Sequence, residues 1–482
     1  MNTKTVVRIR KSLFVHVAFA VFVLSLGIQF AAAQRPFSYY SLDRFDPLVG
    51  IDQRIRPLPP QSTSPKGGIN TFLPTTSATW NLASNWDSNL IPNASDEIVV
   101  FNSPTAAQTV TLDGAKTVGT MSVTNNTVNV WTLAAGTGGP LTFDVGGGNA
   151  SLTIGGTGNV VNVISVATVL NDTLNLAITD TATASVTGAL QITGGISGAG
   201  GVVKSGDGRV SFATNAKTYT GSTTINAGIL RTSLAGIPNA TSGVTVNAGG
   251  QLLLGATASG QTLQFGASTA TVVTLNGDGP TAGSGALANV GNSTTMSNNI
   301  SLASDSTISS SNALTLTGAI SGAGRLTKTG GATLALNVAN TYSGGTTVAL
   351  GSAALIANND GALGTGNVDI NATGGVRLTL QGGLTNNYIS DNATLSLANG
   401  AQANLNYALG GTDVVGGLVL GGAAQLAPGT YGSAASGAMF QFDAFFTGTG
   451  TLTLIPEPST WVMTIMGAGL LMSVQRFRRR KS

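Results

Sequence analysis

Residues 318–348 read GAISGAGRLTKTGGATLALNVANTYSGGTTV, and residues 194–225 read GGISGAGGVVKSGDGRVSFATNAKTYTGSTTI. The two segments are near-copies: Ile196 matches Ile320 at an offset of 124, and Tyr219 matches Tyr342 at an offset of 123. Apolar residues replace other apolar residues between the copies, while turn glycines and the tyrosine are kept. Internal self-similarity of this kind predicts stacked units, none of which can bury its apolar face alone.

The rest of the chain between residues 77 and 454 shows the same pattern, in which apolar and polar residues alternate and glycine-containing turns follow, as in TVTLDG, SLTIGG, VTVNAGG and TLSLANG. Alternation with a period of two over four to six residues indicates β-strands, and glycine permits the tight turns between them. No stretch of a dozen residues between the two ends of the chain shows helical periodicity. The sequence therefore predicts an all-β solenoid body over 77–454, with repeat copies near 194–230 and 318–355.

Composition narrows the class of protein. The 482 residues include no cysteine, and only 9% are charged while 42% are hydrophobic. This excludes a disulfide framework and disorder driven by low hydrophobicity and high charge. Between residues 35 and 455 there are 13 basic and 18 acidic residues. The body is mildly acidic, and we expect no nucleic-acid partner because no basic stripe remains.

The first 76 residues are predicted to contain a targeting signal followed by a spacer. Residues 1–33 combine a basic start, an apolar run and a small-residue exit, which predicts a signal peptide cut by signal peptidase between Ala33 and Gln34. An uncleaved anchor is the alternative. Residues 34–76 hold seven of the 15 prolines, which predicts an extended spacer.

Residues 455–482 are predicted to form a second targeting segment. From Ser459 to Gln475 there is no charge, and RFRRRK follows. The 17 uncharged residues would make roughly 25 Å of helix, which predicts a single, short transmembrane helix. The basic tail would stay cytoplasmic and hold the body outside the inner membrane.

Pro456, Glu457 and Pro458, followed by the apolar segment and the arginine tail, resemble the PEP-CTERM sorting signal of Gram-negative bacteria. The resemblance implies an exosortase-type processing enzyme as a partner, transient anchoring in the inner membrane and transfer to the cell surface or a biofilm matrix. It also implies an association with extracellular polysaccharide. The alternative is an ordinary tail anchor in which the prolines end a strand.

The segment LTKTGGATLALNVANTYSGGTTV, residues 326–348, resembles the autotransporter-associated β-strand repeat. The resemblance implies a right-handed parallel β-helix, with coils of about 20–25 residues. Some 15 coils at ~4.8 Å would span roughly 70 Å. Trp80 and Trp86 lie in the W…NW…P…D lead-in that often precedes such repeats, and we expect a cap there. The alternative is contact with carbohydrate through the two indole rings.

Few residues are suited to catalysis. The only histidine, His16, lies in the signal peptide, so the mature chain has neither the histidine nor the cysteine that common nucleophilic and zinc sites require. Asp369, Asp391 and Asp413 recur every 22 residues and would be turn residues or, alternatively, an acidic ladder for a cation.

Two lysines occupy matching positions in the repeat copies. We expect Lys204 and Lys328 to be solvated surface residues, with Arg209 and Arg325 nearby. The alternative is a pair of anion contacts. We predict no catalytic residue, cofactor or metal.

These observations favour an exported structural or adhesion solenoid of the cell surface or extracellular matrix. One alternative is a carbohydrate-active enzyme, a polysaccharide lyase or hydrolase, on the same scaffold, and another is an inert surface-layer element without a ligand.

Overall fold

The computed structural model describes residues 67–180, 188–407 and 411–455. They belong to the larger of two units in the chain, Ser62–Ser482. The expected signal peptide, with Ala33 and Gln34, and the expected sorting signal, with Pro456, Glu457 and Pro458, lie outside the described residues. So does most of the Pro-rich spacer.

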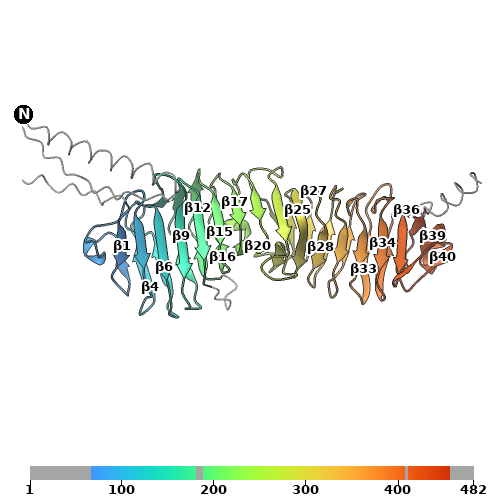
Figure 1. Cartoon of the computed structure of the whole chain (residues 1–482), viewed down its shortest axis with the longest axis horizontal. Coiled ribbons are helices and arrows are strands. Elements are labelled where there is room, and N and C mark those ends of the chain that lie inside the picture. Colours follow the sequence, from blue (N-terminus) through green and yellow to red (C-terminus); the bar gives the residue numbers. More distant parts are fainter. Residues whose placement is uncertain (1–66, 181–187, 408–410, 456–482) are drawn as a thin grey trace, which may run out of the picture. The chain divides into compact units, whose positions relative to one another are not determined.

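The described residues confirm the all-β prediction. They form a parallel β-solenoid of about 13 turns with almost no helix, and successive turns follow one another from β1 to β40 (Figure 1). The turns differ in length: the turn from Ile300 to Ile320 takes 20 residues, whereas the turn from Leu252 to Leu287 takes 35. Some turns are thus longer than the expected 20–25 residues, which is why there are fewer of them than the roughly 15 expected.

Three ladders of strands make up the wall, two of them joined in one 26-stranded sheet. The first ladder consists of β1 (Ile69–Phe72), β3 (Ile98–Phe101), β6 (Thr120–Thr124), β9 (Ala150–Gly155), β12 (Leu174–Ile178), β15 (Val202–Ser205), β17 (Thr223–Ile225), β19 (Val244–Val246), β22 (Val273–Gly277), the first part of β25 (Ile300–Ser310) and β27 (Ile320–Gly322). The second ladder consists of β2 (Ala78–Thr79), β4 (Gln108–Thr111), β7 (Trp131–Ala134), β10 (Asn162–Ile164), β13 (Leu190–Ile192), β16 (Arg209–Phe212), β18 (Gly228–Thr232), β20 (Gly250–Gly255), β23 (Leu287–Val290), the second part of β25, β28 (Leu326–Thr329), β30 (Thr346–Val348), β32 (Val368–Ile370), β34 (Thr394–Leu397), β37 (Gly417–Leu420) and β38 (Ala423–Ala424).

The remaining strands form three smaller sheets. A four-stranded sheet contains β5 (Lys116–Val118), β8 (Leu141–Phe143), β11 (Thr168–Leu170) and β14 (Ile196–Gly198). The eight-stranded sheet contains β21 (Gln261–Leu263), β24 (Thr294–Met296), β26 (Leu314–Leu316), β29 (Leu334–Leu336), β31 (Leu355–Ala357), β33 (Gly375–Leu380), β35 (Ala401–Leu405) and β41 (Phe446–Gly448). The last four-stranded sheet contains β36 (Thr412–Val415), β39 (Gly429–Gly432), β40 (Phe440–Gln441) and β42 (Thr451–Leu454), and three short 3-10 helices are η1 (Ala83–Asn85), η2 (Leu234–Gly236) and η3 (Ala434–Ser436).

The alternation seen in the sequence separates inside from outside. In β29, Leu334 and Leu336 are buried and Ala335 between them is only partly buried. Their counterparts in the neighbouring turns lie directly in register, so inward side chains stack into one continuous apolar core. Small residues are needed where turns touch: a Cβ on Gly318 would lie 2.0 Å from the carbonyl oxygen of Asn298.

The two repeat copies lie on different ladders. On the first ladder, Val202 of β15 is in register, through one residue in each of β17, β19 and β22, with Ile300 of β25 and then with Ile320 of β27. By sequence, however, Ile320 corresponds to Ile196, which belongs to β14 on another sheet. The second copy is therefore displaced by one strand around the axis, and the template fits more than one face of the solenoid.

Both ends are closed by antiparallel pairing. The body begins at Ile69, inside the predicted spacer, because Asn70 and Phe72 already point inward in register with the next turn. Residues 85–87 run back along the outer edge of β1, where Asp87 donates its N–H to Thr71 and accepts from the N–H of Thr71 at 2.8 Å. At the other end, β38 pairs antiparallel with β37, and β39 with β42. These caps cover edges that would otherwise pair with another chain.

In the part of the chain that the structure describes, no helix is long and apolar enough to span a bilayer.

Candidate functional site

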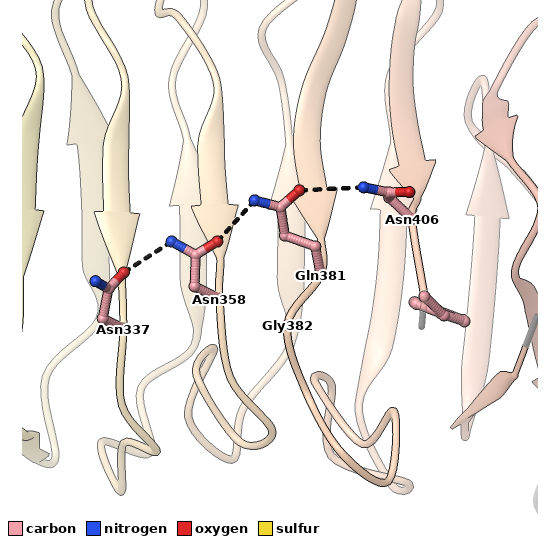
Figure 2. A pocket seen from close by; sticks show the side chains of 6 residues that line it. Asn337, Asn358, Gln381, Gly382 and Asn406 are labelled. Carbon is pink, nitrogen blue, oxygen red and sulfur yellow. Dashed lines mark hydrogen bonds between the residues drawn. The ribbon is translucent and has the colours of Figure 1, made fainter. Parts of the chain in front are cut away.

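A ladder of four side-chain amides runs across consecutive turns on the eight-stranded sheet (Figure 2). The amide nitrogen of Asn358 donates to Asn337 at 2.7 Å, that of Gln381 to Asn358 at 2.9 Å, and that of Asn406 to Gln381 at 3.3 Å. Every bond has the same direction, from the later turn to the earlier one. We call these four residues the amide ladder.

The register of the strands places the amides in one line. Each amide directly follows the last inward residue of β29, β31, β33 or β35, and these inward residues pair across the ladder. The same column continues toward the N-terminus as Thr317, Ser297 and Gln264. A line of hydroxyl and amide groups thus follows seven turns of the sheet.

The amide ladder borders a groove of about 620 Å³. Gly382 and Tyr407 complete its lining. Gly382 has a φ of +79°, and a Cβ there would lie 2.7 Å from the carbonyl oxygen of Asn358. A side chain at this position would therefore be strained, and its absence leaves the groove open.

The lining of the groove carries no charge. Three charged residues from neighbouring turns are each held by local bonds. Burial acts to raise the pKa of Asp360, but the hydrogen bonds that it accepts from the loop of residues 384–387 together outweigh burial and lower that pKa. Arg377 donates to two backbone carbonyls within four residues of itself, and Lys328 is fully buried.

Trp80 and Trp86 belong to the N-terminal cap. Both side chains are fully buried, their ring centroids lie 4.9 Å apart, and each indole N–H donates to a backbone carbonyl at 2.9 Å. A sugar stacks on an open aromatic face, and neither ring offers one. The arrangement favours the cap over carbohydrate contact.

The expectation that Lys204 and Lys328 are solvated was wrong, and so was the alternative of anion contacts. Both side chains are fully buried. The Lys204 ammonium donates to three backbone carbonyls at 2.6 to 3.1 Å, and that of Lys328 to three at 2.7 to 2.9 Å. Lys217 is held in the same way at 2.5 to 3.1 Å. Burial lowers the pKa of each of these lysines from 10.5 to about 8.

The three recurring aspartates do not form a ladder. Asp369 lies in β32, stacks on Ser396 in the next turn and pairs with Arg325 at 2.8 Å. Asp413 lies in β36, where it is 1% exposed, accepts three backbone N–H bonds and has a pKa raised by burial to about 7. Only Asp391 is an exposed turn residue. Loops of unequal length shift the aspartates out of register. The described ranges hold no group of three acidic or histidine side chains suited to a metal ion.

The amide ladder was not predicted from the sequence. The available signal was an Asn or Gln directly after each apolar strand, at spacings of 21, 23 and 25 residues. Such unequal spacings align only once the loop lengths are known.

One comparison with known protein families identifies the same two repeat copies that the sequence shows. The family model described as Passenger-associated-transport-repeat matches residues 202–232 and 326–352. These segments cover β15 to β18 and β28 to β30. No curated protein and no solved structure matches the chain. The repeat and the solenoid together fit a surface-exposed β-helix passenger.

Proposed function

We propose that this protein is a structural and adhesive solenoid of the cell surface or extracellular matrix that associates with extracellular polysaccharide. One observation carries the proposal: a column of outward amides and hydroxyls follows seven turns of the eight-stranded sheet, and its last four members, the amide ladder, border an uncharged groove. Polysaccharides present repeated hydroxyl groups, which both donate and accept hydrogen bonds as these side chains do.

Export is supported by the passenger-type repeat at 202–232 and 326–352. The sequence motifs near the two ends of the chain indicate how the protein would be exported and sorted. Signal peptidase would cut between Ala33 and Gln34, and an exosortase-type enzyme would act at Pro456, Glu457 and Pro458 after transient anchoring in the inner membrane.

Fractionation of the native cells tests this proposal. We expect the protein in the surface or extracellular fraction, and protease added to intact cells should reach it. Replacing Pro456 and Pro458 with alanine should keep the protein in the inner membrane, while replacing Pro280, in a loop of the body, should not. Full-length protein in the cytoplasm would refute export.

The enzyme alternative has its own test. A lyase or hydrolase needs carboxylates, often paired, at the substrate, and the groove lining offers amides. Turnover of a pectin- or alginate-like polymer that is lost in Asp391→Ala would establish the enzyme and replace the adhesive role.

A further inference from the structure

We infer that the amide ladder binds an uncharged, unbranched glycan that lies along the solenoid axis. This inference rests on the proposed function and specifies its ligand. It is drawn from the unused bonding capacity of the amides, from the neutrality of the groove and from the repeat distance of the turns.

The two interior amides keep half of their bonding capacity. A carboxamide has two N–H donors and an oxygen that accepts two bonds. Asn358 and Gln381 each donate one bond to the preceding turn and accept one from the following turn. Each therefore retains one N–H and one acceptor position, and both residues line the groove. A donor beside an acceptor is complementary to a sugar hydroxyl, which needs both.

The bonds within the amide ladder also fix these groups in place. A free Asn or Gln side chain loses rotamer entropy when it binds. Here the amides of Asn358 and Gln381 are oriented by their neighbours in the ladder before any ligand arrives (Figure 2). Pre-orientation of this kind lowers the cost of association.

The charges near the groove argue against an acidic polymer. A carboxylate-bearing glycan requires cations at its binding site. The basic residues between positions 326 and 406, the segment that carries the amide ladder, are Arg377, which is bonded to its own turn, and Lys328, which is buried. Asp360 adds a negative charge, and its four hydrogen bonds hold it ionised. A neutral glycan meets no uncompensated charge.

The spacing favours a linear polymer along the axis. Hydrogen-bonded strands lie ~4.8 Å apart, so the ladder offers one donor–acceptor pair at about that interval. An extended pyranose chain repeats its hydroxyl groups over a comparable distance. The loop of residues 382–387 begins at the groove, and its Leu384 side chain is 95% exposed, which favours a chain without branches on that side.

The test compares glycans and variants by affinity electrophoresis and calorimetry on the full-length protein. The neutral probes are barley mixed-linkage β-glucan and hydroxyethyl cellulose, and the anionic probes are alginate and polygalacturonate. We expect binding of at least one neutral probe and weaker binding of the anionic ones. Gln381→Leu should weaken neutral binding roughly tenfold, as expected for one or two lost hydrogen bonds.

Two further variants keep the test decisive. Asn406→Leu removes the exposed end of the ladder, so it tests the site even if Gln381→Leu fails to fold. The control is an amide pair that does not line the groove, in which Asn247 donates to Asn226 at 2.7 Å. Asn247→Leu breaks this pair and should leave glycan binding unchanged.

The outcomes separate the two claims. Neutral binding that survives in folded Gln381→Leu and Asn406→Leu would overturn the site but keep the proposed function. Binding of alginate or polygalacturonate alone would overturn the neutral ligand. No binding of any polysaccharide, including material from the native matrix, would overturn both.

Discussion

The buried lysines predict that this protein becomes more stable as the pH rises from 7 to 10. Lys204, Lys217 and Lys328 are fully buried and have their pKa lowered from 10.5 to about 8. The unfolded chain therefore binds more protons than the folded chain between pH 8 and 10.5. Under these conditions the free energy of unfolding increases with pH.

The size of the effect follows from the pKa shift. One pKa unit corresponds to about 1.4 kcal/mol, so each lysine contributes a total change of about 3 kcal/mol, of which about 2.5 kcal/mol falls between pH 7 and pH 10. The neutral amine still donates two hydrogen bonds to the surrounding carbonyls. Above pH 10 the trend should reverse, because burial raises the pKa of Tyr219 and Tyr342 above the usual value of 10.

Urea unfolding of the full-length protein, followed by circular dichroism at pH 7, 8, 9 and 10, measures this effect. We expect the midpoint to rise with pH in the wild type. Lys328→Met should lower stability at every pH, because three carbonyls lose their donor, and should reduce the pH-dependent rise by about one third. A midpoint that stays level or falls between pH 8 and 10 would refute the reasoning, as would an unchanged slope in Lys328→Met.

Three other predictions test the caps and the packing. Asp87→Ala removes the carboxylate that accepts the N–H of Thr71 and leaves this edge group of β1 without its partner, so we expect a loss of about 1 kcal/mol and self-association in light scattering; a stable monomer would count against the cap. Gly318→Ala forces a Cβ to within 2.0 Å of a carbonyl oxygen and should cost about 2 kcal/mol, whereas Gly331→Ala, which meets nothing within 4 Å, should be neutral; equal melting temperatures would contradict this. Burial raises the pKa of Asp413 from 3.8 to about 7, so the folded chain keeps a proton that the unfolded chain releases. Stability should fall as the pH rises from about 4 to 7, and Asp413→Asn should flatten that decline; an identical slope would argue against it.

The strand pattern could be predicted because it depends on local alternation. The segment from Leu334 to Leu336 reads as a strand in the sequence and is one in the structure. The position of Lys328 could have been predicted in the same way, since it is in phase with the inward residue Leu326. The expectation of a solvated lysine followed the usual behaviour of a charged side chain and overlooked the carbonyls that the turn supplies.

The functional surface could not be predicted in this way because it depends on non-local register. Asn358 and Gln381 face the same groove only because the intervening loop has the length it has. Asp369 and Asp413 show the converse: a regular spacing in the sequence, broken by unequal loops in the fold. Periodicity identifies which residues point outward, and loop lengths decide which of them become neighbours.

The one-strand displacement between the repeat copies has a consequence for how such a protein can change. Because the same peptide closes its turn whether it starts at β14 or at β27, a duplicated segment need not contain a whole number of turns to be accommodated. Lengthening by an arbitrary strand count would rotate every later side chain to a new side of the molecule. New outward surfaces could thus arise from copying alone, without substitution of a single residue.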